Sequence, residues 1–208
     1  MKNKALKLGI ILFVGIITFS GCTKKGEDDP FLSLRTRTAR LTGEWNVVTY
    51  DSKSLGGSTT IIEKIDGSSY TETYSTNGQG RTYIGTATHT VTIEKDGTYE
   101  NIFNSTSTAS GVTFIDNYKE KGVWYWAEGN KELKTKSKEL VVFQTTEVTS
   151  FNGYDNTVSY YEGPACPLSY MQITQLKNKK MVIEMEGKRT SGTGDATTYE
   201  SSATYEKK

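Results

Sequence analysis

The sequence predicts an all-β protein, and three observations support this fold class. Beyond residue 43, runs rich in Thr, Tyr, Val and Ile alternate between drier and wetter residues, as half-buried strands do. Asp-Gly and Asn-Gly pairs separate these runs at short intervals, and such pairs supply the positive φ angles that tight hairpins need. Helical periodicity is nearly absent, so consecutive strands are expected to be antiparallel neighbours.

Eleven runs are candidate strands, and some of them are expected to merge or fail. They cover residues 44–52, 59–65, 69–75, 82–95, 98–105, 113–126, 138–149, 157–162, 169–176, 181–188 and 197–205. Eight or more strands with little helix leave two architectures, a closed up-and-down barrel or a two-sheet sandwich. Closure of a barrel removes the exposed edges that a long meander would otherwise offer to aggregation.

The run from residue 82 to 94 has the clearest alternation. One lane is predicted to face the interior, and it consists of Tyr83, Gly85, Ala87, His89, Val91 and Ile93. The other lane is mostly threonine and is predicted to face water. His89, the only histidine of the chain, is therefore expected on the drier side.

Residues 31–43 break the strand pattern and predict a short helix that Gly43 ends. Leu34, Thr38 and Leu41 fall on one side of it, whereas its arginines mostly point away. The helix is interpreted as a lid on the core with a basic outer face. The alternative is that the arginines meet anionic lipid headgroups.

The first residues predict a secretory signal peptide over residues 1–21. Three lysines precede an apolar run from Leu8 to Phe19, which is too short to span a bilayer. Cys22 follows "FSG", and this junction resembles that of bacterial lipoproteins, whose first mature residue is a lipidated cysteine. The resemblance implies a lipidated tether over residues 22–30 that holds the protein at a membrane. The length of the remaining chain suits a single domain over residues 31–208.

Glu27, Asp28 and Asp29 form an acidic cluster soon after Cys22. The cluster looks like the surface-export signal of lipoproteins from the Bacteroidetes group, and the resemblance implies an outer-membrane lipoprotein exposed at the cell surface. The other interpretation is a solvated spacer.

Charge and cysteine content exclude several function classes. Loss of three lysines with the signal peptide changes the formal charge from +1 to −2, which indicates no nucleic-acid partner. Cys166 is the only other cysteine, so no internal disulfide framework is expected. A single histidine without ligands at short spacing predicts no metal site and no cofactor. A nucleophile elbow, a Walker sequence and an EF-hand loop are all lacking, so we expect no enzyme activity.

"LTGEWNVV" contains Gly43-x-Trp45 where the helix meets the first strand, and this resembles the Gly-x-Trp signature of lipocalins. With "EKDGTYE", "KGVWYW" and "YMQITQLKNKKMVIE", the chain is similar to a family of Bacteroidetes lipocalin-like lipoproteins. The resemblance implies an antiparallel up-and-down lipocalin-like β-barrel of 8 to 10 strands, closed at one end by the N-terminal helix. It also implies an arginine packed over Trp45, for which Arg189 is the candidate.

The expected function is non-covalent binding of a small apolar or amphiphilic molecule by a monomeric barrel. The candidate wall residues are Trp45, Tyr83, Gly85, Ala87, His89, Trp124 and Trp126. For several of them a structural role is the alternative: Gly85 could mark a bend, His89 could be a satisfied core residue, and the tryptophans could be core. The alternative function is a surface adhesion module with a solid core, which would bind a glycan or a protein through exposed aromatics such as Trp126, Tyr160 or Tyr161.

Overall fold

A computed structural model describes residues 35–129, 138–190 and 196–208 of the chain. Cys22 and the acidic cluster at residues 27–29 lie outside these described residues, as does the signal peptide. Within the described part there are a helix, α2 (Arg37–Leu41), a 3-10 turn, η2 (Gly163–Ala165), and eleven strands. The strands are β1 (Gly43–Gly56), β2 (Thr59–Asp66), β3 (Ser69–Thr76), β4 (Gln79–Ile93), β5 (Thr98–Ala109), β6 (Val112–Trp126), β7 (Leu140–Phe151), β8 (Asn156–Tyr160), β9 (Leu168–Leu176), β10 (Lys180–Thr190) and β11 (Ala196–Lys207).

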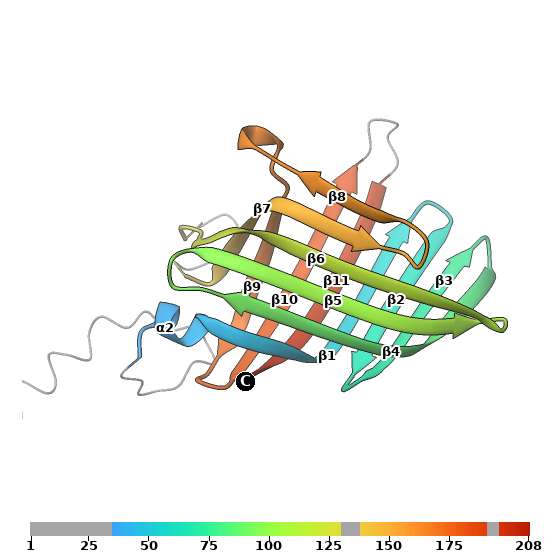
Figure 1. Cartoon of the computed structure of the whole chain (residues 1–208), viewed down its shortest axis with the longest axis horizontal. Coiled ribbons are helices and arrows are strands. Elements are labelled where there is room, and N and C mark those ends of the chain that lie inside the picture. Colours follow the sequence, from blue (N-terminus) through green and yellow to red (C-terminus); the bar gives the residue numbers. More distant parts are fainter. Residues whose placement is uncertain (1–34, 130–137, 191–195) are drawn as a thin grey trace, which may run out of the picture.

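Eight of these strands close into an antiparallel β-barrel, which confirms the predicted fold class. The ring runs β1-β4-β5-β6-β7-β9-β10-β11 and returns to β1, and every pairing in it is antiparallel. Figure 1 shows β4 to β7 crossing in front of β9, β10 and β11. The sandwich architecture is therefore excluded.

The hairpin of β2 and β3 is inserted into the ring at one end. Residues 43–46 of β1 pair with residues 90–93 of β4, whereas residues 49–56 of β1 pair with β2. The outer part of β4, residues 79–86, pairs with β3. The strand total of eleven exceeds the expected 8 to 10 because the two strands of this hairpin and the short strand β8 are added to the ring of eight.

The two ends of the barrel therefore differ. We call the end that holds α2, residues 43–47 and residues 203–207 the base, and the end that holds the β2–β3 hairpin and β8 the mouth. At the mouth β8 pairs only with residues 147–151 of β7, and the pairing of β10 with β9 stops at Glu184. Within the described residues, the barrel wall is thus open between β8 and the outer part of β10.

Helix α2 covers the base (Figure 1). Thr36 caps it by accepting a hydrogen bond from the backbone N–H of Ala39 at 3.1 Å. The expected basic outer face is wrong, because Arg37 and Arg40 are only 4% and 2% exposed. Arg37 donates to the carbonyl of Ile173 at 3.1 Å, and Arg40 donates to that of Leu176 at 2.8 Å. The two guanidinium groups therefore tie the helix to β9, at its last residue and at Ile173 beside the register shift of the β9–β10 pairing.

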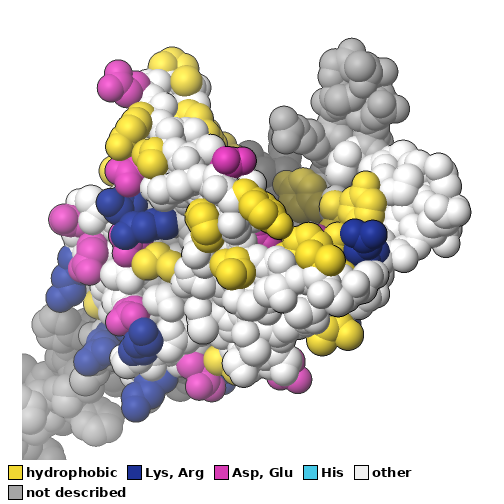
Figure 2. Space-filling view, turned by 45° about the vertical axis from the view of Figure 1, so that its right-hand side comes forward, with side chains coloured by type: hydrophobic (Ala, Val, Ile, Leu, Met, Phe, Trp, Pro, Cys, Tyr) yellow, Lys and Arg dark blue, Asp and Glu magenta, His cyan; other side chains and the backbone are white. Residues whose placement is uncertain are grey.

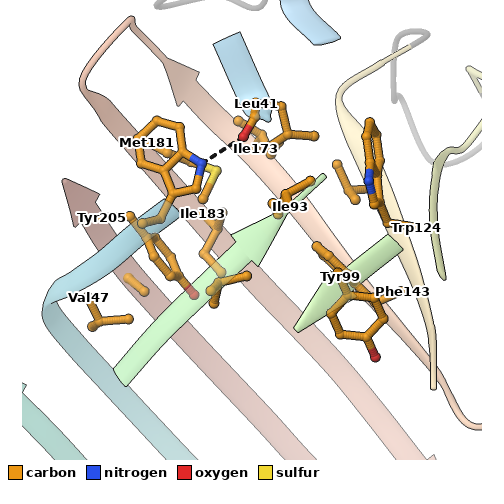
Figure 3. Close-up of a cluster of buried hydrophobic side chains, with 14 of the residues drawn as sticks. Leu41, Val47, Ile93, Tyr99, Trp124, Phe143, Ile173, Met181, Ile183 and Tyr205 are labelled. Carbon is orange, nitrogen blue, oxygen red and sulfur yellow. Dashed lines mark hydrogen bonds between the residues drawn. The ribbon is translucent and has the colours of Figure 1, made fainter. Parts of the chain in front are cut away.

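An apolar core fills the base. Figure 3 shows side chains from α2 and from strands all around the ring meeting there, among them Leu41, Ile93, Ile173 and Ile183. Trp45 is fully buried, and its indole N–H donates to the carbonyl of Leu41 at 2.7 Å. The Gly43-x-Trp45 segment thus joins the helix to the first strand through a buried hydrogen bond, which satisfies the polar atom of a large core residue.

Candidate functional site

The inner face of the barrel carries the lane that the alternation in β4 predicts. Ala87, Val91 and Ile93 are buried, whereas Thr82, Thr86 and Thr88 are exposed. The orientation of the strand is therefore confirmed. Along β6 this inner face changes from Trp124 at the base to Glu120, Tyr118 and Asp116 toward the mouth.

The base leaves almost no room for a ligand. The gap among its side chains has a volume of about 10 Å³, and it is lined by residues such as Leu41, Val91, Phe143 and Met181. Small-molecule sites have volumes of roughly 300 Å³ or more. The base is thus a packed core, as in small barrels whose interior is filled by side chains.

Two further tryptophans of the candidate wall belong to this packed end. The indole N–H of Trp124 donates to the carbonyl of Glu94 at 2.8 Å, and that of Trp126 donates to the hydroxyl of Thr38 on α2 at 3.0 Å. The two rings meet edge to face, with centroids 6.0 Å apart. Trp126 therefore fastens the helix to β6 from inside and is not part of an outer aromatic surface.

Gly85 lies where two strands approach closely. A Cβ atom at this position would be 1.9 Å from the carbonyl oxygen of Thr106 and 2.6 Å from the Cα of Ser107 on β5. Only glycine fits such an approach, which allows strong coiling of β4 against β5. The space beside Gly85 is filled by backbone, so the bend is the interpretation that the geometry supports.

A hydrogen-bond network lies on the inner face between the apolar base and the mouth. The carboxylate of Glu120 accepts from the hydroxyl of Tyr99 at 2.8 Å, from the amide of Asn101 at 3.4 Å and from the hydroxyl of Thr145. These residues come from β5, β6 and β7. Burial raises the pKa of the Tyr99 phenol strongly, so Tyr99 stays a neutral donor to Glu120.

His89 joins this network through Asn101. Its Nε2 is 2.7 Å from Oδ1 of Asn101, and its ring makes edge contacts with Phe103 and Tyr205. The amide nitrogen of Asn101 donates to Glu120, and the amide oxygen of Asn101 faces His89. Because an amide oxygen can only accept, the proton of the His89 ring is assigned to Nε2, which donates to Asn101. Burial lowers the pKa of His89, which favours this neutral form. His89 is therefore a packed structural residue whose ring N–H is hydrogen-bonded to Asn101.

A hollow of about 210 Å³ opens on the inner face at the mouth. It is lined by Glu72 and Tyr74 of β3, Tyr83 of β4, Ser107 of β5, and Phe114 and Asp116 of β6. The rings of Tyr83 and Phe114 form one wall, edge to face with centroids 5.1 Å apart. Figure 2 brings the mouth forward and shows hydrophobic side chains gathered on it, with acidic and basic side chains beside them. We call these six residues the mouth hollow.

The electrostatics of the mouth hollow are acidic. Glu72 pairs across the strands with Glu63 of β2, and both side chains are on the inner face. The pKa of Glu72 is raised, first by burial and then by the carboxylate of Glu63, with a smaller contribution from Asp116. The hydroxyl of Tyr70 donates to Glu72 at 3.3 Å, and that of Ser52 donates to Glu63 at 3.1 Å. Both of these donors are neutral hydroxyl groups.

Of the seven wall residues predicted from the sequence, Tyr83 lines the mouth hollow. Trp45, Ala87, Trp124 and Trp126 pack in the core, Gly85 marks a bend, and His89 belongs to the network. Sequence reasoning missed the other lining residues, although two signals were present. In residues 69–75 the tyrosines and Glu72 alternate with Ser and Thr, and the lane of Trp124 continues by twos back to Asp116 and Phe114.

The cation over Trp45 is Lys207 and not Arg189. Lys207 lies 4.9 Å from the ring centre and donates to the carbonyls of Arg40 at 2.9 Å and Thr42 at 2.6 Å. Arg189 pairs with Thr197, at the opposite end of β11 from Lys207. Register therefore places Arg189 at the mouth, far from Trp45.

Several side chains outside the barrel interior also bear on function. Tyr154 and Tyr160 are 85% and 74% exposed, and Val158 on β8 is exposed as well. Leu168 and Tyr170 are exposed on β9, which pairs with residues 140–144 of β7 while β8 pairs with residues 147–151. Cys166 is a free, buried thiol.

Among residues 35–129, 138–190 and 196–208, no group of three or more His, Cys, Asp or Glu side chains could hold a metal ion. The same described ranges contain no helix with the length and hydropathy to cross a membrane.

Comparisons with protein-family models, with curated proteins and with solved structures gave no match to this chain. The fold and the site therefore define the class of protein. It is an all-β, barrel-like protein with a packed base, a polar network above it and an acidic, aromatic hollow at a wider mouth.

Proposed function

We propose that this protein is a lipid-anchored, lipocalin-like barrel that binds a small amphiphilic molecule non-covalently at its mouth. The observation that carries the proposal is the mouth hollow, where aromatic rings and polar groups converge on about 210 Å³ of space. This volume is below the roughly 300 Å³ of most small-molecule sites, so the ligand is small or extends beyond the hollow into the open mouth. Ligand sites combine apolar walls with a few placed polar groups in this way. No chemical step is assigned, because the one histidine donates within the barrel.

Native mass spectrometry of the purified full-length chain, before and after organic extraction, tests the binding function. We expect a small molecule that leaves on extraction. The variant Ser107→Leu places a larger side chain in the hollow and should abolish the retained mass, whereas Thr106→Leu, on the outer face of the same strand, should keep it. An extracted chain that rebinds nothing, or equal retention by both variants, would argue against the hollow as the site.

The membrane anchor is the second part of the proposal. It rests on the signal peptide, on Cys22 and on the acidic residues at 27–29, as argued from the sequence. We expect Cys22→Ser to move the protein from the membrane to the soluble fraction, because the acyl chains are lost. Replacement of all three acidic residues by alanine should keep the protein in the membrane but protect it from protease added to whole cells. Unchanged fractionation of Cys22→Ser would contradict the anchor.

The exposed tyrosines favour a second candidate function, which is adhesion to a glycan or to a protein. Tyr160 is on the outer face of β8, and Val158 is on the same face. Exposed aromatic rings suit stacking on sugars or partner surfaces. Glycan-array binding by the wild-type chain that Tyr160→Ser abolishes and Ser107→Leu leaves intact would support this function in place of the mouth hollow.

A further inference from the structure

The mouth hollow also indicates which chemical class of ligand it takes. The inference rests on the proposed binding function and adds the charge of the ligand. Three features decide it: the aromatic wall, the carboxylates on two sides, and the position of the nearest basic side chain.

The aromatic wall presents ring faces and edges to one small space. Tyr83 and Phe114 stand edge to face, and Tyr74 lies beside them on β3. The electron-rich face of such a ring attracts a cation within about 6 Å of its centre. The same rings bury apolar surface, so they suit a ligand that carries its charge on a hydrocarbon body.

The carboxylates approach the hollow from two different strands. Glu72 comes from β3 and Asp116 comes from β6. Glu63 of β2 is the cross-strand partner of Glu72. Like charges opposite one another in a sheet are destabilising by themselves. A positive charge placed between Glu72 and Asp116 would reduce the repulsion that Glu72 experiences from Glu63 and Asp116.

The basic side chains near the hollow do not fill this role. Arg81 pairs with Tyr74 but is exposed at the end of β4 and is not part of the lining. Lys64 on β2 bonds Asp51 at 3.0 Å, and both residues alternate with the inner-facing Glu63 and Tyr50. The lining residues therefore include no basic side chain, and a cationic ligand would place positive charge directly between the carboxylates.

A bare metal ion fits the lining poorly. Two carboxylates and one serine hydroxyl fall short of the six to eight oxygen ligands that Ca²⁺ takes, and three of the six lining residues present aromatic rings. The hollow holds about 210 Å³. Because water occupies about 30 Å³ per molecule in the liquid, this space suits a group of about seven non-hydrogen atoms.

We infer that the mouth hollow binds a small organic cation, an ammonium group on an aromatic or alkyl body. The ammonium lies between Glu72 and Asp116, and its body lies against Tyr83 and Phe114. A longer ligand could extend through the open mouth.

Calorimetric titration of the full-length chain with three matched probes tests the inference. The probes are 2-phenylethylamine, 2-phenylethanol and 3-phenylpropionate, which share a ring and a short chain but carry positive, zero and negative charge. We expect the amine to bind about tenfold more tightly than the alcohol, and the carboxylate to bind most weakly. Glu72→Gln and Asp116→Asn, which keep size and remove charge, should each weaken amine binding about fivefold.

Glu206→Gln is the matched control, because Glu206 is exposed at the base and should leave amine affinity unchanged. Equal binding of amine and alcohol would overturn the cationic ligand while leaving the proposed binding function intact. Failure of the amine to bind to a chain that does retain an extractable molecule would do the same. Absence of any ligand in both experiments would overturn both proposals.

Discussion

At the scale of single residues, close approaches of the backbone decide where the barrel can bend. Gly85 and Gly122 have no room for a Cβ atom, since the nearest backbone oxygens would be 1.9 and 2.0 Å away. Gly122 also adjoins the register shift between Lys121 and Gly122 in the pairing of β6 with β7. Such positions allow a sheet to coil tightly enough to close.

Gly85→Ala should therefore destabilise the fold by about 3 kcal/mol, because a main-chain clash cannot be relieved by a rotamer change. Gly80→Ala is the control on the same strand, since its Cβ would be 3.6 Å from the nearest atom. We expect the control to change the free energy of unfolding by less than about 0.5 kcal/mol. Urea denaturation followed by tryptophan fluorescence measures both, and equal effects would show that the close approach is absent in solution.

Lys207 and Lys208 are neighbours with different expected contributions to stability. Lys207 donates to two carbonyls at the end of α2, whereas Lys208 pairs with Glu44 in an exposed ion pair. Lys207→Met leaves those carbonyls without their charged donor and should cost about 1–2 kcal/mol. Lys208→Met should cost less than about 0.5 kcal/mol. Thermal unfolding of the two variants compares them directly, and a larger effect of Lys208→Met would contradict the assignment.

Glu72 should make stability depend on pH in a defined direction. Burial and Glu63 raise its pKa above the ordinary value of 4.5, so the folded state holds the proton more tightly than the unfolded state does. The resulting stabilisation is complete below the pKa that Glu72 has in the unfolded state. It is lost as the pH rises through the higher pKa that Glu72 has in the folded state. Glu72→Gln removes this loss, so its stability relative to wild type should increase from pH 4.5 upward. Parallel pH profiles of the free energy of unfolding would contradict the raised pKa.

At the scale of elements, α2 is too short to be stable alone and depends on its contacts with the barrel. A helix of five residues gains little from its own hydrogen bonds. Its cap at Thr36 and the bonds from Arg37 and Arg40 to β9 hold it over the base. These contacts explain why its arginines are buried although their spacing suggested an exposed face.

Thr36→Ala should reduce the free energy of unfolding by about 1 kcal/mol, because the N–H of Ala39 loses its acceptor. Thr36→Ser keeps the hydroxyl and should stay within about 0.5 kcal/mol of wild type. Chemical denaturation distinguishes the two variants. Equal losses would indicate that the threonine methyl group, and not the cap, matters.

At the scale of the whole molecule, the barrel divides into a closed base and an open mouth. Every ring strand at the base has two neighbours and an apolar core beneath it, whereas β8 at the mouth has one neighbour and five exposed residues. Local stability follows buried contacts and protected hydrogen bonds. The mouth is therefore the part of the barrel that can adjust to a ligand.

Hydrogen exchange measured by mass spectrometry should reveal this division. Peptides that cover residues 43–47, 90–93 and 203–207 should exchange slowest, at rates set by global unfolding, and the peptide that covers β8 should exchange fastest among the strands. Uniform protection of all eleven strands in the described residues would contradict the division.

The sequence by itself determined the strands, their hairpins and the orientation of the inner lane of β4, because alternation with period two and Asn-Gly or Asp-Gly turns are local signals. It also indicated the helix at the base. Only the tertiary structure decided which faces of distant strands share one space. The register of the neighbouring strands β3, β4, β5 and β6 brings Glu72, Tyr83 and Asp116 together, and packing of α2 on β9 buries Arg40. These are long-range pairings, and a local pattern carries no information about which distant strand it will meet.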